Sequence, residues 1–316
     1  MATVKIPVKV GSIEQLSANI KKFEFHPLHE SLLPFSPGSH IRLHLDDIDT
    51  TKAYSLISDP DCTDHYQIAV LLSEQSQGGS AYMHQSLKEG DVIEISPAEN
   101  FFPLLEDTSI KHLFIAGGIG ITPFISYLHA IEKKDLPFEL HYCFRDRKNV
   151  AFASALEDSL KDQLSLYDNS LNHHLDVKAL IEQQPKNTHV YVCGPQSLMD
   201  AVIKHGTDIL GADHVHFENF TETGSSGDAF EVVFEKSGFS LMIDENTSIL
   251  QALEADKRIK VECLCRNGIC GTCETAILEG EALHKDLYLD EEEQAAQKSM
   301  MICVSRAKGK KIVLDL

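Results

Sequence analysis

The spacing of four cysteines near the C-terminus is the feature that most restricts what this chain folds into. Cys265, Cys270 and Cys273 lie in one short segment, separated by four and then two residues, and Cys303 follows after 29 intervening residues. This is the C-x4-C-x2-C…C spacing of a plant-type [2Fe–2S] site. Structural zinc sites usually present two closely spaced pairs of ligands, and here there is one. We expect the four cysteines to ligate an iron–sulfur cluster and Cys263 to be a non-ligating thiol beside it.

Other properties of the sequence exclude several classes of protein. Eight cysteines in 316 residues, five of them clustered, do not fit a small disulfide-stapled secreted domain, and the N-terminal segment has no apolar signal region. No apolar run approaches the roughly 18–20 residues of a membrane span. Asp and Glu number 48 against 28 Lys and Arg, so the formal net charge of −20 leaves no basic footprint for nucleic acid. We expect a cytoplasmic protein with neither nucleic-acid nor membrane partners.

Three patterns follow one another along the chain and predict a multidomain fold. Residues 1–105 alternate as short strands between turns, which is typical of an antiparallel β-barrel or sandwich, and we expect the barrel. Residues 106–222 contain apolar runs that end in glycine and lead into helix-like segments, the pattern of a parallel α/β sheet. Small polar residues (TETGSSGD, Thr221–Asp228) indicate a linker, assigned to residues 223–228. Residues 229–316 then carry a hairpin, a helix and the cysteine motif of an α+β domain.

Two strand ends in the second region are candidates for nucleotide binding. The segment Gly117–Pro123 (GGIGITP) follows an apolar run and opens a helix, where backbone N–H groups favour a pyrophosphate. It is not the G-x-G-x-x-G fingerprint, and a tight strand–helix turn is the plain alternative. Cys193 closes another run, where ligands bind in parallel sheets. The candidate residues are Gly117, Gly118, Gly120, Thr122, Pro123, Cys193, Gly194 and Pro195.

The first region carries two features that suit a flavin. Lys52-Ala53-Tyr54-Ser55 lies between strand-like runs, and Gly78-Gly79-Ser80 follows about 25 residues later. A tyrosine can cover a flat ring, a hydroxyl can hydrogen-bond a flavin nitrogen, and a Gly-Gly-Ser turn with a lysine can hold a phosphate. Taken alone, Tyr54 is more simply a core residue, and the two glycines are more simply a hairpin turn. Their joint presence upstream of a nucleotide loop favours a flavin site.

Taken in order, these motifs resemble those of the phthalate dioxygenase reductase family. The resemblance rests on Tyr54-Ser55-Leu56, Gly78-Gly79-Ser80, Gly118-x-Gly120-x-Thr122-Pro123, Cys193-Gly194-Pro195 and the four cysteines, with Met300–Ala307 especially similar. Members carry a flavin barrel, a nicotinamide domain and a C-terminal plant-type ferredoxin domain. The resemblance implies an NADH-dependent reductase that passes electrons through FMN and a [2Fe–2S] cluster to a terminal oxygenase of the Rieske type.

The resemblance also implies roles for individual residues. Ser55, Thr122 and Cys193 are the candidate catalytic residues, with Ser55 near flavin N5 and Cys193 beside the nicotinamide ring. The remaining cofactor-binding candidates are Tyr54 and Leu56 for the flavin ring, Gly78, Gly79 and Ser80 for its phosphate, and Phe220 for packing against the flavin. Lys52 stands where the family usually has arginine, and lysine offers a point charge without the bidentate fork.

Cofactor specificity is less sharply marked. Arg145 and Asp146 lie where the adenosine ribose is expected, and an acidic residue favours NADH whereas arginines favour the 2′-phosphate of NADPH. The resemblance favours NADH, and the Gly-Gly-Ser turn in a short chain favours FMN over FAD.

Some readings stay open. The acidic run Asp290–Glu293 reads as a capped helix start or as a docking face for the oxygenase. The alternative functions are a reductase for a diiron hydroxylase or for quinones, and a non-catalytic four-cysteine zinc or redox-sensing protein.

Overall fold

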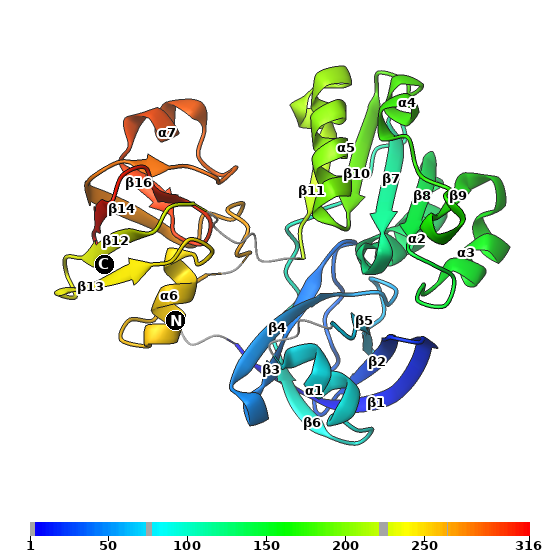
Figure 1. Cartoon of the computed structure of the whole chain (residues 1–316). Coiled ribbons are helices and arrows are strands. Elements are labelled where there is room, and N and C mark those ends of the chain that lie inside the picture. The colour runs from blue at the N-terminus through cyan, green and yellow to red at the C-terminus, as the bar shows by residue number, and fades with distance from the viewer. Residues whose placement is uncertain (1–3, 74–77, 221–226, 264) are drawn as a thin grey trace. The chain divides into compact units, whose positions relative to one another are not determined.

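The chain folds around three main β-sheets, one in each region expected from the sequence (Figure 1). The computed structural model describes residues 4–73, 78–220, 227–263 and 265–316, and the chain divides into two units, Met1–Phe220 and Thr221–Leu316. The first unit contains the predicted barrel and the parallel sheet, and the second contains the cysteine motif. The exact domain limits expected above stay predictions, and most of the predicted linker (221–226) lies outside the described residues.

The first sheet is antiparallel, with the strand order β4-β3-β6-β1-β2-β5. Alternate residues of β3 point into a core that includes Phe23, Ile41, Leu43 and Ile68, as expected for half-buried strands. An antiparallel bridge between Leu56 and Ile68 joins the two edges of the sheet, so that it closes as the predicted barrel. Its elements are β1 (Ile6–Ser17), β2 (Ile20–Pro27), β3 (His40–Leu45), η1 (Asp46–Ile48), β4 (Thr50–Ser55), β5 (Tyr66–Leu71), α1 (Gly79–Gln85) and β6 (Val92–Ile95).

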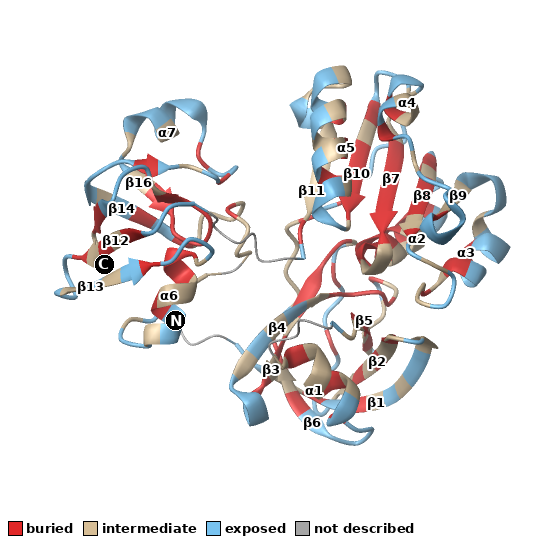
Figure 2. Ribbon diagram, in the orientation of Figure 1, coloured by how far each residue is buried: buried red, intermediate tan, exposed pale blue. Residues whose placement is uncertain are grey.

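The second sheet is parallel, with the order β11-β10-β7-β8-β9, and helices cover both of its faces. Because both faces are buried, β7 and β10 read as continuous apolar runs, and both are almost entirely buried in Figure 2. Helices α2 and α3 pack on one face, and α4 and α5 pack on the other. The elements are β7 (Lys111–Gly117), η2 (Gly118–Ile121), α2 (Thr122–Lys134), β8 (Phe138–Phe144), α3 (Ala153–Leu160), η3 (Lys161–Gln163), β9 (Leu164–Asp168), η4 (Asn169–Leu171), α4 (Val177–Glu182), β10 (Thr188–Cys193), α5 (Gln196–Ile209), η5 (Ala212–His214) and β11 (Val215–Glu218).

The second unit is built on a mixed sheet with the order β13-β12-β18-β14-β16. Arg306 is buried at 1% exposure, and its guanidinium donates to the carbonyl oxygens of Thr247, Asp228 and Asp244 at 2.8–3.0 Å. This side chain therefore ties three loop carbonyls into the domain. The elements are β12 (Phe230–Phe234), β13 (Phe239–Ile243), α6 (Ile249–Asp256), β14 (Glu274–Glu279), β15 (Ala282–Leu283), α7 (Glu291–Ala296), β16 (Ser299–Met301), β17 (Arg306–Ala307) and β18 (Lys311–Leu314).

The acidic run begins a helix. Asp290 is the N-cap of α7, where its carboxylate accepts from the Glu293 backbone N–H at 2.8 Å and the Glu293 carboxylate accepts from the Asp290 N–H at 3.0 Å. This reciprocal capping box confirms the capping interpretation.

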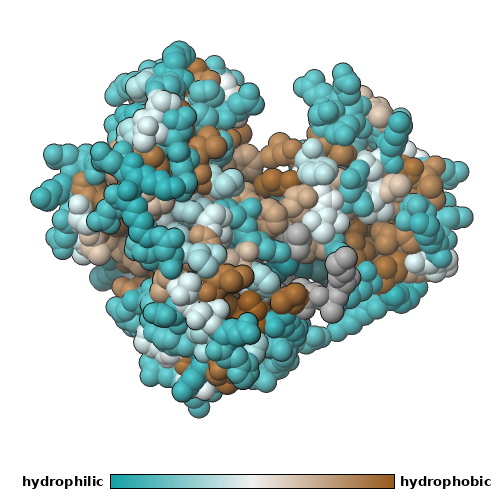
Figure 3. Space-filling view, turned by 180° about the vertical axis from the view of Figure 1, so that it is seen from behind, coloured by the Kyte–Doolittle hydropathy of each residue, from teal (hydrophilic) through white to brown (hydrophobic). Residues whose placement is uncertain are grey.

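Hydrophilic side chains cover most of the face seen in Figure 3, and apolar side chains gather in several patches on it. Among the helices that the structure describes, none has the length and apolar character to cross a membrane.

Candidate functional site

The glycine-rich loop after β7 packs directly against the end of β10. A Cβ atom on Gly120 would lie 2.3 Å from the Cys193 carbonyl oxygen, and one on Gly194 would lie 2.8 Å from the Gly117 Cα. A Cβ on Gly117 would lie 2.4 Å from Pro195 Cδ. The structure thus brings the two predicted nucleotide motifs together, because glycine alone allows the backbones to approach this closely.

Thr122 lies where this loop enters α2. Its side chain is 2% exposed, and its hydroxyl donates to the Ile119 carbonyl oxygen at 3.0 Å, with Pro123 in the first turn. The Ser126 hydroxyl, one turn later, accepts from the Gly38 backbone N–H at 2.9 Å. Helix α2 therefore connects the nucleotide loop to the barrel within the first unit.

A carboxylate that the sequence analysis missed completes this region. Glu218 ends β11, beside Cys193 in the parallel register, and its carboxylate accepts from the Ser55 hydroxyl at 3.4 Å. Burial raises the pKa of Glu218 to about 8, although the Ser55 hydrogen bond acts in the opposite direction. Burial and the Glu218 charge raise the pKa of the Cys193 thiol far above its usual range. A hydroxyl, a thiol and a carboxyl able to hold a proton at neutral pH therefore share one site.

The sequence held one signal for Glu218: an acidic residue inside the half-apolar stretch His216–Phe220. From the same stretch, Phe220 is predicted to pack against the flavin, and its side chain is 45% exposed at the end of the first unit. Tyr54, also predicted to contact the flavin, is half-buried, and burial raises its pKa to about 12. The Leu56 side chain packs into the barrel core.

The predicted phosphate residues lie together in the barrel. Gly79 begins α1 beside Lys52 of β4, and a Cβ on Gly79 would lie 2.9 Å from Lys52 Cγ. Gly78 adopts a φ of +108°, a conformation that favours glycine. Ser80 accepts a hydrogen bond from the Ser73 N–H at 3.2 Å. A lysine side chain next to a glycine turn fits a phosphate group.

Asp146 and Arg145, which are predicted to lie near the adenosine ribose, differ in their hydrogen bonding and exposure. Asp146 accepts from the backbone N–H groups of Lys148 and Asn149 at 3.0 and 3.1 Å, and hydrogen bonds, first of all from the Asn149 side chain, hold its pKa below the usual range. Its carboxylate therefore stays ionised while it shapes the turn after β8. Arg147 is paired with Glu157 at 2.7 Å. Arg145 is exposed beside Asp146.

The predicted cluster loop directs backbone N–H groups at sulfur. The Cys265 thiol accepts from Asn267 and Ile269 at 3.4 and 3.3 Å, and the Cys270 thiol accepts from the Cys265 N–H at 3.5 Å. A Cβ on Gly271, at φ +75°, would lie 2.3 Å from the Tyr288 ring. Hydrogen bonds to the sulfurs are one of the factors that set the reduction potential of a thiolate-bound cluster, so the loop fits the group.

The remaining predicted ligands, Cys273 and Cys303, are 2% and 3% exposed and lie in the core of the second unit. The Sγ atoms of Cys263, Cys273 and Cys303 lie within 4.8 Å of one another. The structure therefore places a fifth thiol next to two of the four predicted ligands.

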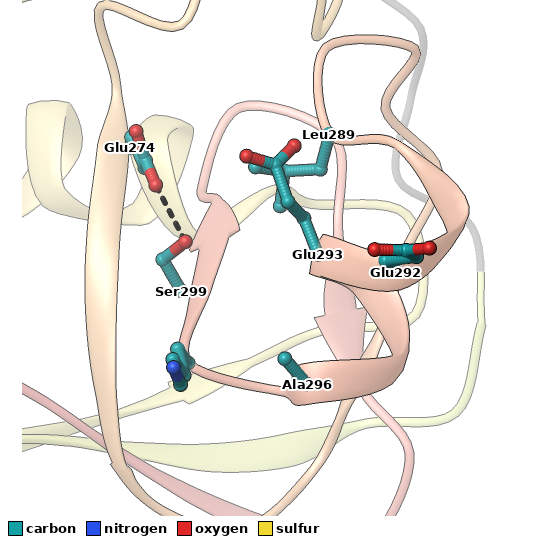
Figure 4. Close-up of a pocket in the computed structure, with 7 residues that line it drawn as sticks. Glu274, Leu289, Glu292, Glu293, Ala296 and Ser299 are labelled. Atoms are coloured by element: carbon teal, nitrogen blue, oxygen red, sulfur yellow. Dashed lines mark hydrogen bonds between the residues drawn. The ribbon is translucent and has the colours of Figure 1, made fainter.

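A surface pocket of the second unit lies between α7 and the strands β14 and β16. Figure 4 shows Glu274, which accepts from the Ser299 hydroxyl at 2.5 Å, facing the carboxylate of Glu293 across it. The lining residues are Glu274, Leu289, Glu292, Glu293, Ala296, Lys298 and Ser299. None of the predicted site residues lines this pocket, and its carboxylates largely serve the helix cap and the strand edge.

Three family models match successive parts of the chain. An oxidoreductase FAD-binding domain matches residues 7–101, an oxidoreductase NAD-binding domain matches residues 114–204, and a 2Fe-2S iron-sulfur cluster binding domain matches residues 233–308.

Relatives match over nearly the whole chain. The carnitine monooxygenase reductase subunit of Escherichia coli (strain K12) is 45% identical over 314 residues, 98% of each chain. The heme-dependent oxidative N-demethylase beta subunit of Ectopseudomonas mendocina (strain ymp) is 39% identical, over 98% of this chain and 99% of that protein. The solved structure of phthalate dioxygenase reductase superposes with a TM-score of 0.75 at 32% identity, over 99% of this chain and 98% of that one.

Proposed function

The chain belongs to the phthalate dioxygenase reductase-like family of flavin and [2Fe–2S] oxidoreductases, and from this premise we propose that it serves a Rieske-type monooxygenase acting on carnitine or a related quaternary ammonium compound. Members of this family are reductase components, which transfer electrons from NAD(P)H through the flavin and the cluster. The observation that carries the proposal is the 45% identity, over 98% of both chains, to a carnitine monooxygenase reductase subunit. Family membership also decides against the zinc alternative.

The residues of the first unit have separable tasks in this proposal. The flavin phosphate is held by Lys52, Gly79 and Ser80. The close packing of Gly120 against Cys193 positions the backbone that contacts the nicotinamide ring. Bound flavin accepts a hydride as two electrons and releases them singly, and a bound [2Fe–2S] cluster carries single electrons. Glu218, with a pKa of about 8, keeps a proton next to Ser55 near neutral pH. This proton keeps the Glu218 carboxyl neutral. An ionised carboxylate at this position would repel the negative charge that the flavin gains when it is reduced.

NADH and FMN are the proposed cofactors. The resemblance puts Asp146 beside the adenosine ribose; the pKa of Asp146 is lowered, and Arg147 is paired with Glu157 at 2.7 Å. Repulsion by this carboxylate supports NADH over NADPH. Extraction and chromatography of the bound flavin should yield FMN, and kcat/KM should be higher for NADH; recovery of FAD, or preference for NADPH, would contradict the respective assignment.

A haem-containing partner is the second candidate, because a haem-dependent N-demethylase subunit is 39% identical over nearly the whole chain. The purified protein can be combined with NADH and either a carnitine monooxygenase oxygenase component or a haem-dependent N-demethylase. The proposal predicts carnitine-dependent NADH oxidation that exceeds turnover with the haem partner. Turnover with the haem partner alone would overturn it.

A further inference from the structure

The five cysteines around the cluster loop fall into two groups. Cys263, Cys273 and Cys303 form one, with their Sγ atoms within 4.8 Å of one another. Cys265 and Cys270 form the other, because the Cys270 sulfur accepts from the Cys265 backbone N–H at 3.5 Å. A [2Fe–2S] cluster takes four thiolates. When Cys265, Cys270, Cys273 and Cys303 are the four ligands, the remaining thiol is Cys263, which belongs to the first group.

The position of Cys263 follows from the segment that carries it. Ile259, Val261 and Cys263 all pack against the core of the second unit. These three residues alternate along the segment and all pack against the same core, so the segment directs the Cys263 side chain inward. The backbone conformation of this segment therefore places the Cys263 thiol beside Cys273 and Cys303.

We propose that Cys263 is a reserve ligand of the cluster, whose sulfur replaces that of Cys303 when Cys303 is lost. The substitution is chemically balanced: the Cys263 thiol releases one proton as it binds iron as a thiolate, and no electron is transferred. Cys265, Cys270 and Cys273 would supply the other three ligands. The proximity is specific, because the 4.8 Å group includes neither Cys265 nor Cys270. We therefore expect no other thiol to replace Cys270 as a ligand when Cys270 is lost.

Four alanine variants test this in the full-length protein: Cys263→Ala, Cys303→Ala, the double variant Cys263→Ala/Cys303→Ala, and Cys270→Ala as the matched control. Alanine is chosen because a serine oxygen can itself bind iron. After anaerobic purification, iron and acid-labile sulfide per chain are measured, together with the visible spectrum and the electron paramagnetic resonance spectrum after dithionite reduction. Flavin content and far-ultraviolet circular dichroism report folding.

The proposal predicts that Cys263→Ala keeps its full cluster and that Cys303→Ala keeps a cluster with an altered spectrum. The double variant and Cys270→Ala should lose it. Should Cys303→Ala not fold, Cys303→Val, which keeps an apolar side chain in this buried position, takes its place. A Cys303 variant as poor in iron and sulfide as the double variant would overturn the proposal. Loss of the cluster in Cys263→Ala would also overturn it, since Cys263 would then be a resident ligand.

Discussion

Replacing Gly120 with alanine is a direct test of the site at the ends of β7 and β10. The added Cβ would lie 2.3 Å from the Cys193 carbonyl oxygen, 2.5 Å from its carbon and 2.8 Å from the Gly194 nitrogen. Ordinary contact begins at 3.4 Å, so one backbone has to move by about 1.1 Å. Because the atoms in the way are backbone atoms, no side-chain rotation relieves the clash.

Two consequences of this displacement are measurable. Overpacking of this kind costs about 1–3 kcal/mol of the free energy of unfolding. A shift of about 1 Å at a reacting centre lowers the rate by roughly 100-fold. We therefore expect Gly120→Ala to lower kcat/KM for NADH about 100-fold in a ferricyanide reduction assay, with flavin still bound and Tm lowered by roughly 2–10 °C.

Another glycine serves as the control. A Cβ on Gly309 meets no atom within 4 Å, so Gly309→Ala should behave as the wild type. If Gly120→Ala keeps the wild-type kcat/KM, or if Gly309→Ala loses as much activity, the steric argument is refuted.

Three further predictions concern the phosphate site, the buried carboxyl and the modular arrangement. Lys52→Glu should weaken flavin binding by roughly 10- to 100-fold while Lys52→Arg retains it, because a charged hydrogen bond contributes about 1.5–3 kcal/mol; equal flavin content in both variants would show that Lys52 does not contact the phosphate. Because the pKa of Glu218 is raised from 4.5 to about 8 in the folded protein, wild-type stability should fall relative to Glu218→Gln as pH rises between these values and stay level above about 8; a constant difference in Tm from pH 5 to 9 would contradict this. A fragment ending at Gly224 should reduce ferricyanide with NADH but fail to support the oxygenase; loss of flavin from the fragment would refute the modular arrangement.

Local patterns in the sequence were sufficient to predict the three sheets. The apolar runs at β7 and β10 are buried on both faces, which leaves a continuous signal, and the alternation in β3 reflects a barrel wall with one buried face. The capping box at Asp290 is likewise local, because its two hydrogen bonds join residues three positions apart.

Contacts between distant residues were beyond the reach of these patterns. Ser55 and Glu218 are 163 positions apart, and only the closed barrel and the parallel register bring them together. The proximity of Cys263 to Cys303 depends on which way the segment before the cluster loop turns its side chains. The spacing of the other cysteines identified the cluster without revealing that neighbour.

Anaerobic reduction of the purified full-length protein by NADH tests most directly the claim that electrons pass through the flavin to the cluster. Visible absorption would follow the flavin, and low-temperature electron paramagnetic resonance would follow the reduced [2Fe–2S] cluster. The account predicts that NADH alone produces the cluster signal in the wild type, whereas the Cys270→Ala variant shows flavin reduction without it. Full bleaching of the wild-type flavin with no signal from an intact cluster would contradict the account.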